Sequence, residues 1–170
     1  MIRRTLFSLA LALALQTAAH AAPMVGRPTP PLAGQTLNGP PISLAALRGR
    51  VVVLNLWATW CAPCREEMPA LDAFYRRYAP RGVVVLGLST DKPQAMAIAQ
   101  RIMSNFSYPA IMGSTAAVNG FGMPSEVPVT LIIGPDGVVR AIVNGEGGLL
   151  TEQRLAALVE PLLPRMESRS

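Results

Sequence analysis

The sequence predicts an α/β domain with a mixed central sheet and helices on both faces. Two apolar, β-branched runs at 51–56 and 83–88 indicate strands buried on both faces, and helical spacing of apolar residues follows each of them. Buried strands that are joined through helices lie parallel in one sheet. Two further apolar runs, 127–133 and 138–143, flank the turn residues 134–137, which predicts an antiparallel pair at one edge. The 170 residues suffice for one such domain.

The first 21 residues have the pattern of a signal peptide. Arg3 and Arg4 precede an apolar stretch at 6–15, and Ala19-His20-Ala21 has the small-x-small order of a cleavage site. We therefore predict a signal peptide at 1–21 and a periplasmic protein. The apolar stretch is shorter than the roughly 20 residues of a membrane span. An uncleaved leader is the alternative, and it would anchor the protein in the inner membrane.

Residues 22–50 are predicted to form an N-terminal extension that contains a hairpin. Residues 22–41 are rich in proline and glycine and cannot form a helix, and 37–39 have the composition of a hairpin turn. The segment 43–49 predicts one short helical turn, with Ser43 as its N-cap and Gly49 as its end.

The main domain is predicted at 51–165, followed by a tail at 166–170. After the first strand we expect, in order, a helix at 64–78 that Pro69 kinks, a strand at 83–88, a helix that starts at 89–93 and runs through about 104, a short strand at 108–112, a weak helix at 116–120, the two edge strands, and an amphipathic helix at 151–163. The last helix should bury Leu155, Leu158 or Val159, and Leu162.

Both cysteines of the chain, Cys61 and Cys64, fall where the first buried strand meets the first helix. The first turn of a helix leaves backbone N–H groups unpaired and carries partial positive charge, and both favour a thiolate over a thiol. Cys61 is therefore the candidate nucleophile. Cys64 lies one turn along, where it can close a small disulfide and expel a bound partner, which is the chemistry of thiol–disulfide exchange.

Two other interpretations of the cysteine pair are weaker. A structural disulfide across so short a loop would stabilise the fold by only about 2 kcal/mol. A structural zinc site takes four Cys or His ligands, and the one histidine, His20, lies in the predicted signal peptide. The mature chain would therefore also lack Ser–His and Cys–His catalysis. We expect no bound cofactor or metal.

The charge distribution argues against a nucleic-acid partner. Loss of Arg3 and Arg4 with the signal peptide lowers the formal charge from +5 to +3. The remaining basic residues are arginines and Lys92, and they are scattered along the chain without an aromatic-interleaved basic patch. We expect a monomer whose basic character serves solubility.

The segments 47–69, which include Trp60-Cys61-Ala62-Pro63-Cys64, and 127–137, which begin Val127-Pro128-Val129-Thr130, closely resemble the exported thioredoxin-like reductases of the TlpA and ResA type. The resemblance covers nearly all of 30–165. It implies a thioredoxin fold with an N-terminal hairpin and a central insertion. It also implies reduction of disulfides in exported proteins, with a membrane thiol reductant as electron donor. In members that serve cytochrome c maturation, the target is an apocytochrome.

The resemblance assigns roles to individual residues. Cys61 would be the attacking thiolate and Cys64 the resolving thiol. Pro128 would be a cis-proline beside the disulfide that helps to present a neighbouring strand to the partner backbone. Trp60 would cover the site, with a core aromatic as the alternative. Pro63 would tune the redox potential, for which about 30 mV corresponds to roughly 1.4 kcal/mol.

Glu67 is the candidate for proton transfer. Asn55 stands where thioredoxins carry a buried aspartate, and it cannot titrate. The exported branch instead has a glutamate three residues after the second cysteine, which is Glu67 here. The hypothesis is that Glu67 is partly buried, has a raised pKa and shuttles the proton of Cys64. The alternative is a solvated glutamate that the helix dipole stabilises.

Three alternative functions use the same cysteine pair. A peroxiredoxin carries Pro-x-x-x-Thr-x-x-Cys, and Ala58 occupies the threonine position. A copper chaperone of the Cys-x-x-x-Cys type needs a distal histidine, although a reduced pair could still bind Cu(I). An exported oxidase typically has Cys-Pro-His-Cys, so the Cys-Ala-Pro-Cys sequence favours a reducing role.

Overall fold

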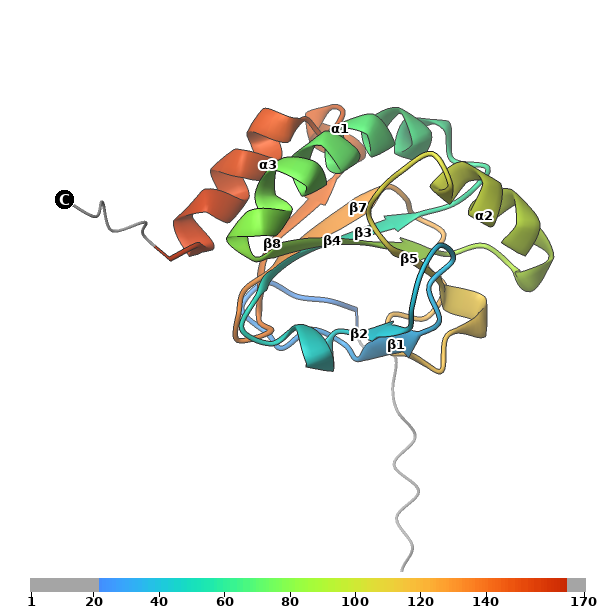
Figure 1. The fold of residues 1–170 in the computed structure, drawn as a ribbon, viewed down its shortest axis with the longest axis horizontal. Coiled ribbons are helices and arrows are strands. Elements are labelled where there is room, and N and C mark those ends of the chain that lie inside the picture. The colour runs from blue at the N-terminus through green and yellow to red at the C-terminus, as the bar shows by residue number, and fades with distance from the viewer. Residues whose placement is uncertain (1–21, 165–170) are drawn as a thin grey trace, which may run out of the picture.

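The computed structural model describes residues 22–164, and a five-stranded mixed sheet forms their central layer (Figure 1). Its strand order is β5-β4-β3-β7-β8. The five strands are β3 (Val51–Trp57), β4 (Val83–Ser89), β5 (Ala110–Met112), β7 (Val129–Ile133) and β8 (Val139–Asn144). β3, β4 and β5 run parallel, and β7 is antiparallel to both β3 and β8. The mixed α/β class is confirmed, whereas the predicted signal peptide and tail lie outside the described residues.

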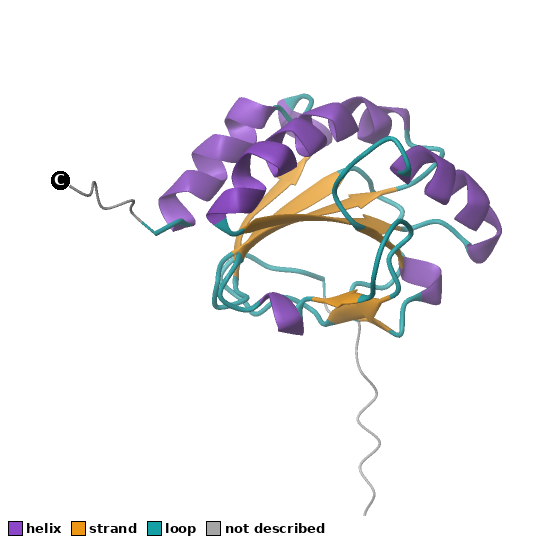
Figure 2. Cartoon of the chain, in the orientation of Figure 1, coloured by secondary structure: helices purple, strands orange, loops and turns teal. Residues whose placement is uncertain are grey.

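The α-helices of residues 22–164 pack on one face of this sheet (Figure 2). They are α1 (Ala62–Tyr78), α2 (Met96–Met103) and α3 (Glu152–Val159). Leu71 of α1, Met103 of α2 and Leu155 of α3 share one core cluster with Val53 of β3. This distribution differs from the expected helices on both faces. The crossovers through α1 and α2 both step in the same direction across the sheet, so right-handed connections place both helices on the same side.

A small antiparallel sheet covers the opposite face. Its order is β2-β1-β6, and its strands are β1 (Leu32–Gly34), β2 (Ile42–Ser43) and β6 (Val118–Asn119). The side chains of Leu32 and Leu44 pack there against Val52 and Leu54 of β3. The antiparallel pairing of β1 with β2 confirms the predicted N-terminal hairpin.

The prediction of a weak helix at 116–120 is wrong. The 3-10 turn η4 (Gly113–Thr115) precedes β6, and β6 pairs antiparallel with β1. Gly120 N–H also donates to Pro31 C=O at 2.7 Å. These hydrogen bonds to a remote segment replace the local bonds of a helix, which the residues at 116–120 favour only weakly.

The remaining elements lie close to their predicted places. Five further 3-10 turns are η1 (Ala45–Leu47), η2 (Ala79–Arg81), η3 (Pro93–Ala95), η5 (Gly145–Gly147) and η6 (Glu160–Leu162). The N-cap of η1 is Leu44 and not the predicted Ser43, which belongs to β2, although the Ser43 hydroxyl accepts a hydrogen bond from Ala46 N–H at 3.2 Å. α1 starts two residues before the predicted position and continues past Pro69 to Tyr78.

The last helix turns the expected face to the core, but α3 ends at Val159, and Leu162 lies partly buried in η6. The Thr151 hydroxyl accepts a hydrogen bond from Arg154 N–H at 3.2 Å, and Leu155 and Val159 are buried. In residues 22–164 no helix combines the length and the hydropathy that crossing a membrane requires.

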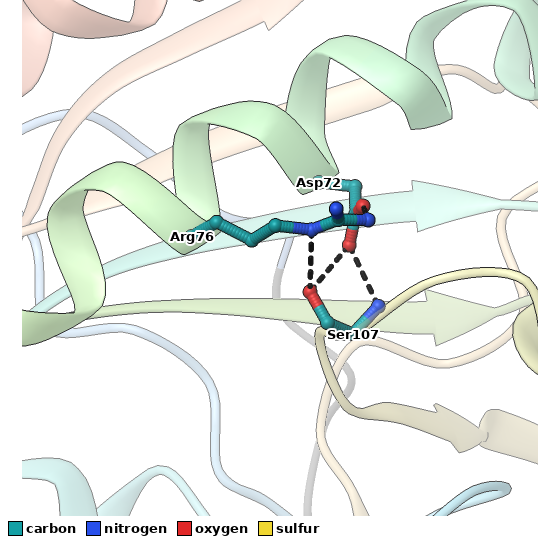
Figure 3. Close-up of polar contacts among 3 residues, drawn as sticks. All are labelled: Asp72, Arg76 and Ser107. Carbon is teal, nitrogen blue, oxygen red and sulfur yellow. Dashed lines mark hydrogen bonds and ion pairs between the residues drawn. The ribbon is translucent and has the colours of Figure 1, made fainter.

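A buried carboxylate joins α1 to the loop before β5 (Figure 3). Asp72 is 4 % exposed and accepts hydrogen bonds from both the N–H and the hydroxyl of Ser107, each at 2.6 Å. Arg76 forms an ion pair with the same carboxylate. Burial alone would raise the pKa of Asp72, but the bonds from Ser107 and Arg76 outweigh it and lower the pKa. The ionised carboxylate therefore stabilises the folded chain.

We expect Asp72→Asn to lower the free energy of unfolding at pH 7 by about 1–3 kcal/mol, the cost of disturbing a buried hydrogen-bonded group. An aspartate in the unfolded chain titrates near pH 3.9. Because the folded pKa is lower, the contribution of the carboxylate is fully present above about pH 4 and is lost as the pH falls through the folded pKa. Urea unfolding should therefore show a smaller difference at pH 3 than at pH 7.

The control is Asp136→Asn, which removes an exposed carboxylate that pairs with Arg140 on a surface turn. This variant should leave the urea midpoint at pH 7 almost unchanged, because exposed ion pairs contribute little. Equal losses for the two variants would contradict the stabilising role of Asp72.

Candidate active site

The two cysteines lie at the junction that β3 and α1 form. β3 ends at Trp57, a turn closes with a hydrogen bond from Cys61 N–H to Ala58 C=O at 3.1 Å, and α1 begins at Ala62. Cys61 is the N-cap residue of α1, with extended backbone angles. A disulfide joins Cys61 to Cys64, with their Cα atoms 5.3 Å apart. The expected position of the pair, where a buried strand leads into a helix, is confirmed.

The helix terminus provides an environment for a negatively charged sulfur. The Cys64 N–H donates a hydrogen bond to the Cys61 Sγ at 3.2 Å. Unpaired N–H groups and the partial positive charge of a helix N-terminus stabilise a thiolate at this point. Cys61 is 4 % exposed and Cys64 is 0 % exposed. A substrate sulfur that approaches from solvent therefore reaches Cys61 first, because Cys64 has no exposed surface.

Two exposed residues, Trp60 and Pro63, lie next to the cysteines in the sequence. Trp60 is 63 % exposed, so it is not a core aromatic, and the fully buried tryptophan is Trp57. Pro63 is exposed and lies in the first turn of α1. A proline is tolerated there because its missing N–H would have had no partner within the helix.

Pro128 lies beside the end of β3. The Val127–Pro128 peptide bond is cis, as the resemblance implied. Val129, the first residue of β7, pairs with Leu56 in the antiparallel register. One residue further along, the same register places Pro128 opposite Trp57, where the loop that carries the cysteines begins.

Glu67 is a buried carboxylate on the cysteine helix. It is 4 % exposed and lies three residues beyond Cys64, on the same face of α1. One of its oxygens, Oε1, accepts a hydrogen bond from Leu150 N–H at 2.9 Å. Burial raises the pKa of Glu67, although the Leu150 N–H and the positive charge of Arg154 offset part of the rise. The alternative of a solvated first-turn glutamate is therefore wrong.

The side chain of Asn55, which cannot titrate, forms a hydrogen bond to a neighbouring strand. It is fully buried on β3, and its Nδ2 donates to the hydroxyl of Thr130 on β7 at 2.9 Å. Its Oδ1 has no hydrogen-bond partner among the described residues. The Asn55 side chain cannot accept the proton of Cys64. The buried carboxylate that lies nearest to Cys64 along the chain is Glu67.

Sequence reasoning missed Asp91. Residues 89–93 were expected to start a helix, but the turn η3 is capped by Lys92 without a side-chain hydrogen bond. The Asp91 carboxylate is buried and instead accepts hydrogen bonds from Thr59 and Ser89. A signal was available, because β4 ends just before Asp91 and side chains at the carboxyl ends of neighbouring parallel strands meet at one edge of a sheet.

Metal ligands do not gather anywhere in the part of the chain that the structure describes. No group of three or more His, Cys, Asp and Glu side chains lies close enough there to hold an ion.

A thioredoxin-like protein with a redox-active cysteine pair is the class that this fold and site define. The chain matches the model of the AhpC/TSA family over residues 25–142, and it belongs to that family. It is 28 % identical over 141 residues to the thiol-disulfide oxidoreductase ResA of Bacillus cereus, covering 82 % of this chain and 79 % of the relative. It is 32 % identical over 119 residues to the thioredoxin-like protein YneN of Bacillus subtilis, covering 69 % of each chain.

A solved structure of a related protein has a similar fold. The crystal structure of a DsbF homologue from Corynebacterium diphtheriae is 28 % identical, matches with a TM-score of 0.66, and covers 79 % of this chain and 86 % of that chain. The thioredoxin fold that the sequence implied is confirmed. The protein is a thiol:disulfide oxidoreductase.

Proposed function

We propose that the protein reduces disulfide bonds in exported proteins, with Cys61 as the attacking thiolate and Cys64 as the resolving thiol. The observation that carries this proposal is the hydrogen bond from Cys64 N–H to the Cys61 Sγ at 3.2 Å, at the N-terminus of α1. The structure shows this bond to a sulfur of the disulfide, and in the reduced pair the same N–H would favour the ionised form of Cys61, the cysteine that keeps some exposure.

The exchange has two steps. The Cys61 thiolate attacks one sulfur of the substrate disulfide, which forms a mixed disulfide and releases the first substrate thiolate. Cys64 then loses its proton and attacks the Cys61 Sγ, which forms the Cys61–Cys64 bond and releases the second substrate thiolate. Two electrons thus pass from the cysteine pair to the substrate. A membrane thiol reductant returns the pair to its dithiol form.

The predicted leader supports export to the periplasm. The order of a basic start, an apolar stretch and Ala19-His20-Ala21 belongs to a secretory signal. In an oxidising compartment a dithiol persists only when a donor keeps it reduced, which is why the proposal includes one. The resemblance to TlpA and ResA makes an apocytochrome c one candidate substrate.

The surface beside Cys61 is suited to a polypeptide. Trp60 offers an exposed aromatic face next to the attacking sulfur. Pro128 lies just before β7 and outside its paired residues, so the backbone around it is available to a partner strand. Pro63, between the cysteines, shapes the turn that must close when the disulfide forms and so tunes the redox potential.

Cys64→Ala should hold a substrate on Cys61, because the mixed disulfide can no longer be resolved. We expect the reduced variant to form a stable adduct with an oxidised model protein such as insulin, visible by mass spectrometry and reversed by dithiothreitol. Cys61→Ala is the matched control and should form much less adduct, because the remaining sulfur is fully buried. Equal trapping by the two variants would reverse the assignment of the cysteines.

The same preparation separates the alternative functions. Reduced wild-type protein should reduce insulin disulfides faster than it consumes hydrogen peroxide. It should also release Cu(I) to a competing chelator. Faster turnover of peroxide than of disulfides would favour the peroxidase, and retention of Cu(I) against the chelator would favour the copper chaperone.

We also propose that Glu67 accepts the proton of Cys64 in the second step. A carboxylate with a raised pKa is closer to the pKa of a thiol, so the proton transfer is less uphill. Glu67→Gln should slow resolution of the mixed disulfide at pH 7 by about 10²-fold, the lower end of what a positioned base contributes. The rate should then follow the ionisation of Cys64 alone, as stopped-flow measurements from pH 5 to 9 can show.

Glu66→Gln is the control, because Glu66 neighbours Glu67 on α1 but is exposed. It should resolve the mixed disulfide at the wild-type rate across the pH range. A wild-type pH profile in Glu67→Gln would remove the proton-transfer role and leave the role of the two cysteines intact.

A further inference from the structure

The loop between β3 and α1 is held by a carboxylate from the end of β4. The two oxygens of Asp91 accept hydrogen bonds from the N–H of Thr59, the hydroxyl of Thr59 and the hydroxyl of Ser89, each at 2.8 Å. Asp91 N–H in turn donates to the Ser89 hydroxyl at 3.1 Å. Asp91 is 3 % exposed and Ser89 is 0 % exposed. A buried carboxylate with three short donors strongly constrains the groups that donate to it.

Thr59 belongs to the turn that places the attacking sulfur. This turn runs from Ala58 to Cys61 and closes with the hydrogen bond from Cys61 N–H to Ala58 C=O at 3.1 Å. On its strand side, Thr90 N–H donates to Trp57 C=O at 2.8 Å, which extends the pairing of β3 with β4. Asp91 thus binds the turn two residues before Cys61, through hydrogen bonds from both the backbone and the side chain of Thr59.

We propose that Asp91 is a positioning residue that sets the reactivity of Cys61. It holds the Ala58–Cys61 turn in the conformation in which the Cys61 Sγ receives the Cys64 N–H. The inference rests on the proposed role of Cys61 as the attacking thiolate. The hydrogen bonds of Asp91 go to Thr59 and Ser89 and not to either cysteine, so it acts through Thr59.

The molecule contains a matched control for this role. Asp72 also accepts the N–H and the hydroxyl of a single residue, Ser107, and it is buried to a similar extent (Figure 3). It lies on α1 eight residues beyond Cys64, which is about 12 Å along the helix axis. Loss of either carboxylate should lower stability, but only loss of the bonds to Thr59 should alter Cys61.

The test measures the alkylation of Cys61 by iodoacetamide in the Cys64→Ala background from pH 4 to 9. Thr59→Val removes the hydroxyl donor, preserves the shape of the side chain and leaves the Asp91 charge in place. Its alkylation rate at pH 5 should fall about three- to tenfold, less than the full effect of losing a hydrogen bond to a charged group, because the Thr59 N–H still binds Asp91, and the midpoint of the profile should rise. Thr59→Ser keeps both donors and should reproduce the parent profile.

Asp91→Asn distinguishes positioning from a direct effect of charge. If Asp91 positions the turn, this variant should also react more slowly at pH 5. If the carboxylate acts only through its field, removal of a negative charge should make Cys61 react faster, and the proposal is then wrong. Asp72→Asn should lower the thermal midpoint of unfolding and leave the alkylation profile unchanged.

Three results would overturn the inference. These are a parent-like profile in both Thr59→Val and Asp91→Asn, a faster reaction in Asp91→Asn, and an equal shift in Asp72→Asn, which would indicate general loosening. The parent protein reports separately on the proposed function. If its Cys61 reacts no faster than an ordinary thiol at pH 5, the role of Cys61 as a thiolate fails, whatever the variants do.

Discussion

The site depends on one constraint, which is that Cys61 must be the last residue before α1 and not the first residue within it. Only as the N-cap does its sulfur face an N–H group that the helix leaves unpaired, and that group is the N–H of Cys64. The burial of β3 on both faces fixes where the strand ends, and the four-residue turn fixes where the helix starts. The thiolate that we propose for Cys61 therefore depends on this junction, and other elements act on it from outside.

Two buried carboxylates lie near the junction, and the different roles that we propose for them follow from their surroundings. Asp91 has three donors at 2.8 Å, so its burial is matched by hydrogen bonds, and it serves as a rigid acceptor. Glu67 has the single N–H of Leu150 as its close donor, and burial raises its pKa. A buried carboxylate with few compensating donors has a raised pKa, whereas several short hydrogen bonds to a carboxylate constrain the groups that donate them. The two proposed roles thus differ through the number of donors rather than through the type of residue.

What the sequence could predict follows from how local each signal is. The strands β3, β4, β7 and β8 and the helix α1 were predictable, because their periodicity and turn residues lie within each segment. β6 was not, because it becomes a strand only through its pairing with the remote β1. The placement of the α-helices on one face of the sheet was not predictable, because it depends on the order of the strands, which short segments do not encode. The bond between Asp91 and Thr59 spans 32 residues, so it becomes visible only once β3 and β4 lie side by side.

The chain from residue 22 onward contains no histidine, and this limits how Cys64 can lose its proton. A histidine near its usual pKa would exchange protons at neutral pH without any help from burial. The pKa of a carboxylate moves towards that of a thiol only when its charged form is destabilised, which requires a desolvated position. Glu67 occupies such a position one helical turn beyond Cys64, and the Leu150 N–H that it accepts keeps its charged form accessible. The packing of the loop before α3 onto α1 therefore does more than close the core, because it buries the carboxylate that we propose as the proton acceptor of Cys64 and donates the Leu150 N–H to it.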